Sequence, residues 1–114
     1  MKERREILIV GLNHRTAPVE IRERLSFTTG DKRHPLKELI SLDPIDECVI
    51  ISTCNRVEVV VVSHKPEQAE NYTVEFFSSY NKVPVEEFED HLYMLKKEEA
   101  VRHLFRVTSS LDSM

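Results

Sequence analysis

The spacing of apolar residues predicts four strands and four helices along the chain. Short runs rich in branched apolar side chains predict strands over residues 6–12, 47–53, 56–63 and 91–95. Amphipathic segments that open on a proline are typical of helices, because proline fits the first helical turn. Such segments follow Pro18, Pro35 and Pro66, a short acidic turn or helix follows Pro84, and a last helix is expected over residues 97–111. The apolar stripe of this last helix is predicted to comprise Ala100, Val101, Leu104, Phe105 and Leu111.

This order of elements predicts an α+β fold of the ferredoxin-like class. A strand, a helical crossover, two strands, a helix and a fourth strand form the split β-α-β sandwich of that class, here with an extra helix in the first crossover. The first strand is then central and pairs with the third and the fourth. We expect residues 1–95 to form this domain. Residues 96–114 should begin a C-terminal linker helix that continues in a longer protein, because the last residues carry no glycine cap.

Composition is that of one soluble globular domain. Of the 114 residues, 40% are hydrophobic and 32% charged. No apolar run approaches the roughly 20 residues that a membrane-spanning helix needs, and the charged N-terminus has no signal-peptide pattern. We therefore expect a cytoplasmic protein with reduced cysteines and no membrane contact.

Charge is unevenly distributed along the chain. The net charge of −4 gives no general electrostatic footprint for nucleic acid. The first 24 residues nevertheless carry more basic than acidic side chains, whereas residues 66–90 are strongly acidic. A polyanion should therefore contact the N-terminal segment and avoid the second half of the chain.

Cys54 is the candidate nucleophile of the chain. It stands in Ser-Thr-Cys-Asn-Arg at the end of a buried strand, where a loop exposes a side chain that the sheet holds rigidly. The charge of Arg56 close to the thiol would lower its pKa and raise the thiolate fraction. Cys48 lies inside an apolar strand and is expected to be inert. The two cysteines fit no zinc-binding spacing, so no metal site is expected.

Arg56 and the histidines leave alternatives open. Arg56 can form a salt bridge with Glu58 or capture a ligand carboxylate with its planar fork. His34 and His64 are expected to be solvated, and His103 to lie on the surface or to serve packing. Residues alone do not decide whether His14 in the first loop and His91 at the fourth strand converge on Cys54.

Three segments together resemble the catalytic N-terminal domain of glutamyl-tRNA reductase. They are residues 11–20 (GLNHRTAPVE), residues 51–58 (ISTCNRVE), and residues 91–93 with 100–107 and 110–114. The resemblance implies an oxidoreductase that reduces glutamyl-tRNA to glutamate-1-semialdehyde with NADPH. This reaction is the first step of five-carbon tetrapyrrole, or porphyrin, biosynthesis.

The resemblance also implies roles for particular residues. Cys54 would attack the aminoacyl ester to form a thioester, with His91 as the catalytic histidine. Arg56 would hold the substrate carboxylate. The other expected substrate-binding residues are Thr53, Asn13, His14, Thr16, Ser109 and Ser110.

The same resemblance implies partners outside these residues. The sequence contains no G-x-G-x-x-G motif, so NADPH is expected to bind a domain that follows. Glutamyl-tRNA is the expected substrate and a homodimer is expected through an absent C-terminal domain. Channelling of the product to glutamate-1-semialdehyde aminomutase is a further expectation.

Two rival functions compete with this reading. The first is a non-catalytic ferredoxin-like domain that binds a regulatory ligand or RNA. RNA-binding versions carry stacking aromatics on the sheet, whereas the aromatics here are predicted on helix faces (Tyr72, Phe76, Phe77 and Phe105). The second is a thiol hydrolase that uses Cys54 with His91 or His14.

Overall fold

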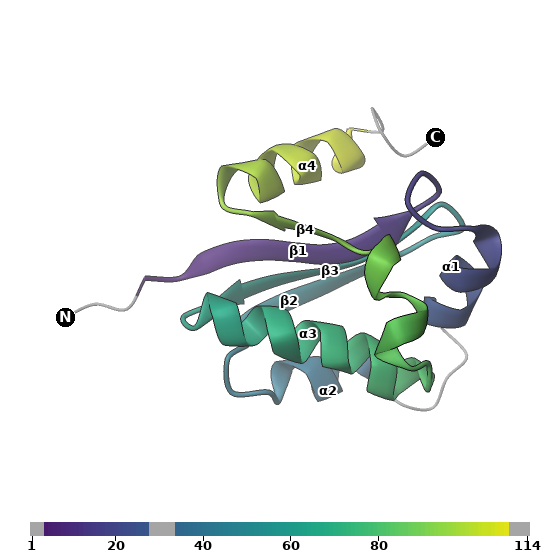
Figure 1. The fold of residues 1–114 in the computed structure, drawn as a ribbon. Coiled ribbons are helices and arrows are strands. Elements are labelled where there is room, and N and C mark those ends of the chain that lie inside the picture. Colours follow the sequence, from purple (N-terminus) through teal and green to yellow (C-terminus); the bar gives the residue numbers. More distant parts are fainter. Residues whose placement is uncertain (1–3, 28–33, 110–114) are drawn as a thin grey trace.

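The computed structural model describes residues 4–27 and 34–109 and has a four-stranded antiparallel sheet (Figure 1). The strands are β1 (Glu6–Asn13), β2 (Glu47–Ser52), β3 (Arg56–Ser63) and β4 (Tyr93–Lys96), in the spatial order β2-β3-β1-β4. Strand β1 is central and pairs with β3 and β4. The ferredoxin-like order predicted from the sequence is therefore confirmed.

Helices cover the two faces of the sheet unequally (Figure 1). One face carries α1 (Val19–Leu25), α2 (Pro35–Ile40) and α3 (Pro66–Asn81), and α1 and α2 are the two helices of the first crossover. Two 3₁₀ turns, η1 (Val85–Glu87) and η2 (Glu89–His91), lead from α3 to β4. The other face carries α4 (Glu98–Thr108), which follows β4 directly.

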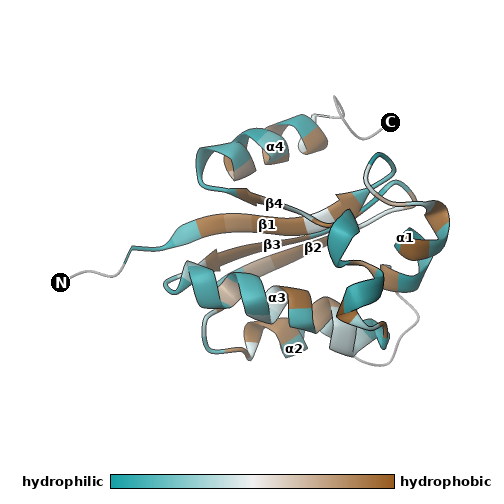
Figure 2. Cartoon of the chain, in the orientation of Figure 1, coloured by the Kyte–Doolittle hydropathy of each residue, from teal (hydrophilic) through white to brown (hydrophobic). Residues whose placement is uncertain are grey.

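The larger core lies between the sheet and helices α1 to α3. Alternate residues of β1 and β3, such as Leu8, Val10 and Val59, point to this side and are fully buried. Aromatic side chains of α3 fill the space beneath them, and the ring of Phe27 stacks on Phe76 with centroids 5.7 Å apart. The strands are hydrophobic along most of their length, whereas the helices mix hydrophobic and hydrophilic positions (Figure 2).

A smaller core lies beneath α4. Ile9, Val60 and Ala100 are buried there, with Leu104 packed against them. The predicted apolar stripe of α4 was partly wrong, because Val101 and Phe105 face outward and Phe105 is 71% exposed. The stripe that faces the sheet instead follows the spacing i, i+3, i+4, and its middle position is His103. Leu111, also placed on the stripe, lies outside the described residues.

Smaller differences concern the ends of elements. Strand β4 begins at Tyr93 because His91 belongs to η2, so the predicted start of the fourth strand at residue 91 was wrong. None of the helices within residues 4–27 and 34–109 is long and apolar enough to cross a membrane. The division of the chain at residue 95 stays a prediction.

Gly11 of β1 makes room for a large polar side chain on the α4 face. It lies opposite Glu58 of β3 and opposite Tyr93 of β4. A Cβ atom at Gly11 would stand 2.7 Å from both Cγ of Glu58 and the carbonyl oxygen of Val57. The absent side chain therefore leaves the gap across which Tyr93 reaches Glu58.

We expect Gly11→Ala to destabilise the domain by about 1–3 kcal/mol, because the added methyl group overpacks a rigid strand. The measurement is urea denaturation followed by circular dichroism. The control is Ser79→Ala at an exposed position of α3, which should change stability by less than about 0.5 kcal/mol. An unchanged midpoint for Gly11→Ala would show that the strands shift to admit the methyl group.

Candidate active site

The three predicted motifs meet at one end of the sheet. The backbone N–H of His14, in the loop after β1, donates to the carbonyl of Asn55 in the β2–β3 turn at 2.8 Å. Nδ1 of His91 lies 2.9 Å from the carbonyl of Thr16 and donates to it. The first loop is thus tied to the cysteine turn on one side and to η2 on the other.

Asn13 and Thr16 fold the first loop upon itself. Oδ1 of Asn13 accepts from the backbone N–H groups of Arg15 at 2.9 Å and Thr16 at 3.2 Å. Oγ1 of Thr16 accepts in turn from the backbone N–H of Asn13 at 3.0 Å. Such side-chain bonds to nearby backbone define a tight polar turn. The loop therefore presents the side chain of His14 to solvent.

Cys54 is exposed on a turn that hydrogen bonds hold in place. Oγ1 of Thr53 accepts from the backbone N–H groups of Asn55 and Arg56, each at 3.2 Å. From α1, Nε of Arg22 donates to the carbonyl of Cys54 at 3.2 Å, and its Nη1 donates to the carbonyl of Ala17 at 2.6 Å. The thiol is therefore accessible while its backbone is fixed.

Cys48 is less accessible than Cys54. Its side chain is half-buried, and its sulfur lies 4.0 Å from the carbonyl of Leu36. Burial raises the pKa of the Cys48 thiol, which lowers its thiolate fraction near neutral pH. Of the two thiols, Cys54 is the more exposed.

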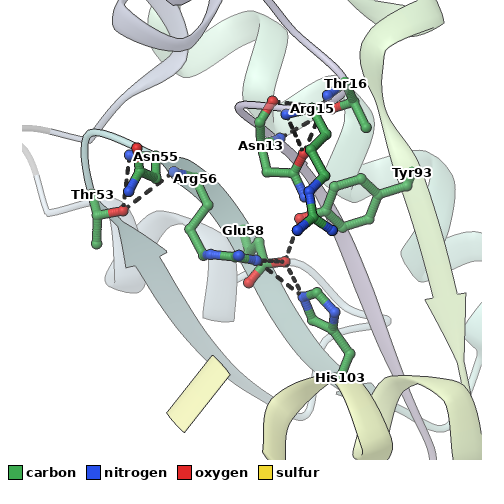
Figure 3. A network of polar contacts seen from close by, with 9 residues as sticks. All are labelled: Asn13, Arg15, Thr16, Thr53, Asn55, Arg56, Glu58, Tyr93 and His103. Carbon is green, nitrogen blue, oxygen red and sulfur yellow. Dashed lines mark hydrogen bonds and ion pairs between the residues drawn. The ribbon is translucent and has the colours of Figure 1, made fainter. Parts of the chain in front are cut away.

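A polar cluster is buried beneath α4 (Figure 3). Arg56 and Glu58 of β3 have side chains only 1% and 0% exposed, and Nη1 of Arg56 donates to Oε2 of Glu58 at 3.2 Å. The same oxygen accepts from the hydroxyl of Tyr93 and from Nε2 of His103. Three strong donors thus compensate one carboxylate that has no contact with water.

Tyr93 stays protonated within this cluster. Burial raises the pKa of its phenol far above the usual value, and the hydrogen bond to Glu58 raises it further. The phenol is therefore protonated near neutral pH and donates its proton to the carboxylate.

The structure separates some predicted site residues and joins others. Arg56 forms the ion pair with Glu58, which was one of the two alternatives, and its guanidinium points toward α4. The arginine that lines the pocket beside Cys54 is Arg22. Within the described part of the chain, no hydrogen bond links the Cys54 thiol to His14 or His91.

The structure decides two histidine predictions. Of the two alternatives for His103, surface and packing, it shows packing, since the side chain is 13% exposed, bonded to Glu58 and in edge-on contact with the Tyr93 ring. Its Nε2 also lies 3.4 Å from Nη1 of Arg56. The sequence feature that could have predicted this burial is the position of His103 three residues after Ala100, which places both on the inner face of α4. The prediction for His64 was wrong. His64 is not simply solvated, because its Nδ1 bonds to Asp46 at 2.8 Å and this bond lowers the pKa of Asp46.

Of the two predicted serines, Ser109 lies at the end of α4. The hydroxyl of Ser109 donates to the carbonyl of Phe105 at 2.6 Å and is exposed. Ser110 lies outside the described residues. Ser109 thus forms a local cap at the helix end.

Fold and site together define a ferredoxin-like domain that presents a thiol at one end of its sheet. The chain matches the family described as the N-terminal domain of glutamyl-tRNAGlu reductase over residues 10–114, and it belongs to this family. The resemblance seen in the motifs is thereby confirmed.

Similar proteins are named glutamyl-tRNA reductase. The chain is 48% identical to the glutamyl-tRNA reductase of Pelobacter propionicus, with 95% of this chain and 25% of the relative covered. It is 50% identical to that of Paenibacillus macerans with the same coverage. The solved glutamyl-tRNA reductase of Methanopyrus kandleri superposes with a TM-score of 0.70 at 29% identity, covering 100% of this chain and 24% of that one. The chain thus spans about a quarter of the length of these relatives.

We expect Glu58→Gln to cost about 3–5 kcal/mol of stability, because it leaves the buried Arg56 charge without its counter-ion. Urea denaturation measures the loss. The matched control is Tyr93→Phe, which removes one donor but keeps the ion pair and should cost less. A Glu58→Gln protein as stable as the Tyr93→Phe protein would contradict a charged Arg56–Glu58 pair as the centre of the cluster.

Proposed function

We propose that this chain is the catalytic domain of a glutamyl-tRNA reductase and that Cys54 attacks the aminoacyl ester of glutamyl-tRNA. The observation that carries the proposal is the exposed Cys54 thiol on a turn fixed by Arg22 and Thr53, in a chain of this family. A rigidly held, accessible thiol is what acyl transfer requires.

The chemical step at Cys54 is transfer of the glutamyl group from an oxygen ester to the thiol, which forms a thioester. The thiolate sulfur forms a bond to the ester carbonyl carbon, and the bond from that carbon to the ribose oxygen breaks. The ribose oxygen takes up a proton from solvent and leaves as the terminal hydroxyl of the tRNA. Oγ1 of Thr53 already accepts two backbone N–H groups, so its own proton can be donated to the carbonyl oxygen as negative charge develops there.

Arg56 is proposed to hold the side-chain carboxylate of the glutamyl group. Its guanidinium is held in orientation by Glu58, and a pre-oriented planar fork selects carboxylates over amides. His103 joins His91 as a candidate active-site histidine, because it lies beside Arg56 whereas His91 bonds to the first loop. His14 is exposed at the same end of the sheet and is proposed to contact substrate.

The remaining predicted residues are assigned less direct roles. The polar groups of Asn13 and Thr16 bond to their own loop and are proposed to shape it. Ser109 and Ser110 stay proposals for substrate contact.

The residues of this chain do not fit the binding of a nicotinamide dinucleotide. The sequence has two glycines, and Gly11 lies inside β1, so no glycine-rich turn leads from β1 to α1. We assign the reduction to glutamate-1-semialdehyde, with NADPH as donor, to the rest of the full-length protein. Homodimerisation, channelling to the aminomutase, a cytoplasmic location and entry into tetrapyrrole synthesis belong to the same proposal.

The rival functions have less support. A sheet that binds RNA needs an open face with stacking aromatics, whereas α4 packs on one face and α1 to α3 on the other. A thiol hydrolase needs a histidine base bonded to the thiol, and the described residues provide no such bond.

We expect this chain, mixed with glutamyl-tRNA, to release the tRNA and to carry glutamate on Cys54. Acid quenching followed by peptide mass spectrometry detects the thioester. Cys54→Ser should abolish it, because an unactivated hydroxyl is a much poorer nucleophile, whereas Cys48→Ser should leave it unchanged. Equal deacylation by Cys54→Ser would mean that Cys54 is not the acyl acceptor.

We expect Arg56→Lys to slow acylation of Cys54 by glutamyl-tRNA about ten- to hundredfold, because charged hydrogen bonds worth about 1.5–3 kcal/mol are lost. Alkylation of Cys54 by iodoacetamide should be unchanged, which separates substrate recognition from misfolding. The control is Tyr93→Phe, which disturbs the Glu58 cluster but keeps the guanidinium. Normal acylation by Arg56→Lys would remove Arg56 from carboxylate recognition.

A further inference from the structure

Strand β4 lies at one edge of the sheet, and part of its backbone faces no partner strand. It pairs with β1, and within the described residues no strand lies on its other side. The backbone N–H of Lys97 donates to the carbonyl of Ile7 at 3.0 Å, and hydrogen-bonded pairs alternate along an antiparallel ladder. Leu95 therefore directs its backbone groups to β1, whereas Met94 and Lys96 direct theirs away from the sheet.

A pocket of about 630 Å³ lies between this free edge and α3. Val74, Val85 and Leu92 line the pocket and also pack against the larger core, so its floor is apolar and fixed in place. Met94 lines the pocket as well, with a side chain that is 38% exposed. An edge strand with a side-chain pocket beside it is the arrangement at which extended peptides add as a further strand.

The rim of the pocket is acidic. Glu75, Glu89 and Asp90 line it with exposed side chains, and none of these carboxylates forms an ion pair within residues 4–27 and 34–109. Lys96 does not neutralise them, because its ammonium pairs with Glu70 of α3 at 2.8 Å. A ligand that is complementary to this groove therefore carries basic groups on either side of an apolar one.

We propose that this groove binds an extended segment of a partner protein, which adds to β4 as a fifth, antiparallel strand. The backbone of the segment bonds to the free N–H and C=O groups of Met94 and Lys96. An apolar side chain enters the pocket beside Met94, and basic side chains two residues before and after it reach the carboxylates on the rim. The intervening side chains point to the opposite face of the sheet. This binding does not involve the chemistry at Cys54.

The probe is a fluorescein-labelled pentapeptide with arginine at both ends, leucine in the centre and threonine between them. Fluorescence anisotropy measures its dissociation constant for this chain. Replacement of both arginines by glutamate should abolish binding, and added salt should weaken binding of the original peptide, because exposed charges are screened. Equal affinity of the two peptides, or no binding at millimolar peptide, would overturn the proposal.

Backbone methylation of the peptide separates strand addition from charge attraction alone. In the proposed antiparallel register the leucine directs its N–H to β4, whereas the threonines direct theirs to solvent. N-methylation of the leucine removes a hydrogen bond to the strand edge and should raise the dissociation constant about tenfold. N-methylation of one threonine should change it by less than about twofold, since no bond to β4 is lost. Equal effects of the two methyl groups would rule out an added strand.

Charge reversals on the rim locate the binding site on this chain. Glu75→Lys combined with Glu89→Lys should raise the dissociation constant about tenfold, because two exposed ion pairs with the peptide are lost. The control is Glu86→Lys, which changes an exposed carboxylate of η1 outside the pocket and should have an effect below about twofold. An affinity that survives the double reversal unchanged would place the peptide elsewhere.

Hydrogen exchange reports the added strand directly. Saturating peptide should slow exchange of the Met94 and Lys96 amides, which gain acceptors, and leave the amide of Leu95, already directed to β1, unchanged. Sedimentation velocity on the same samples detects a second copy of the chain at this edge. Unchanged exchange at Met94 and Lys96 in the saturated sample, or a dimer of the chain that excludes the peptide, would overturn the proposal.

Discussion

The carboxylate of Glu58, buried without any exposed surface, constrains how this domain is assembled. A charge in that position is stable only where hydrogen-bond donors surround it, because its removal from water costs several kcal/mol. The donors come from three elements: Arg56 from β3, Tyr93 from β4 and His103 from α4. Tyr93 reaches the carboxylate across β1 only because Gly11 carries no side chain. One polar interaction therefore fixes the edge strand, the central strands and the last helix against one another.

This constraint gives the two faces of the sheet different properties. The face toward α1, α2 and α3 is packed with apolar side chains and supplies most of the hydrophobic free energy. The face toward α4 has a small apolar core, with the charged cluster beside it at the end of the sheet where the cysteine turn lies. Arg56 can be kept there in a defined orientation because Glu58 neutralises its charge. Burial that is costly for stability thus places a guanidinium close to the end of the sheet where Cys54 lies.

Much of the fold could be predicted because each element carries a local signal. The apolar runs are short enough to be strands, and Pro35 and Pro66 mark helix starts that the structure confirms at those positions. The residues of the buried polar cluster are marked by weaker patterns in the sequence. Hydrophobic periodicity treats His103 as a polar interruption of the apolar stripe, although its position places it on the inner face of α4. The bond between His64 and Asp46 joins residues 18 positions apart, and no local pattern reports it.

Two arginines near Cys54 have different partners. The sequence suggested that Arg56, two residues from Cys54, would act on the thiol directly. In the structure Arg22 from α1 binds the carbonyl of Cys54 and also that of Ala17, so it joins the cysteine turn to the first loop. Arg56 turns away to Glu58 and α4. Because the alternation of side chains along β3 sends Arg56 to one face while α1 lies on the other, the exposed thiol has a cationic side chain on either side of the sheet. Under the proposed function, an ester bound at Cys54 would lie at the end of the sheet between these two side chains.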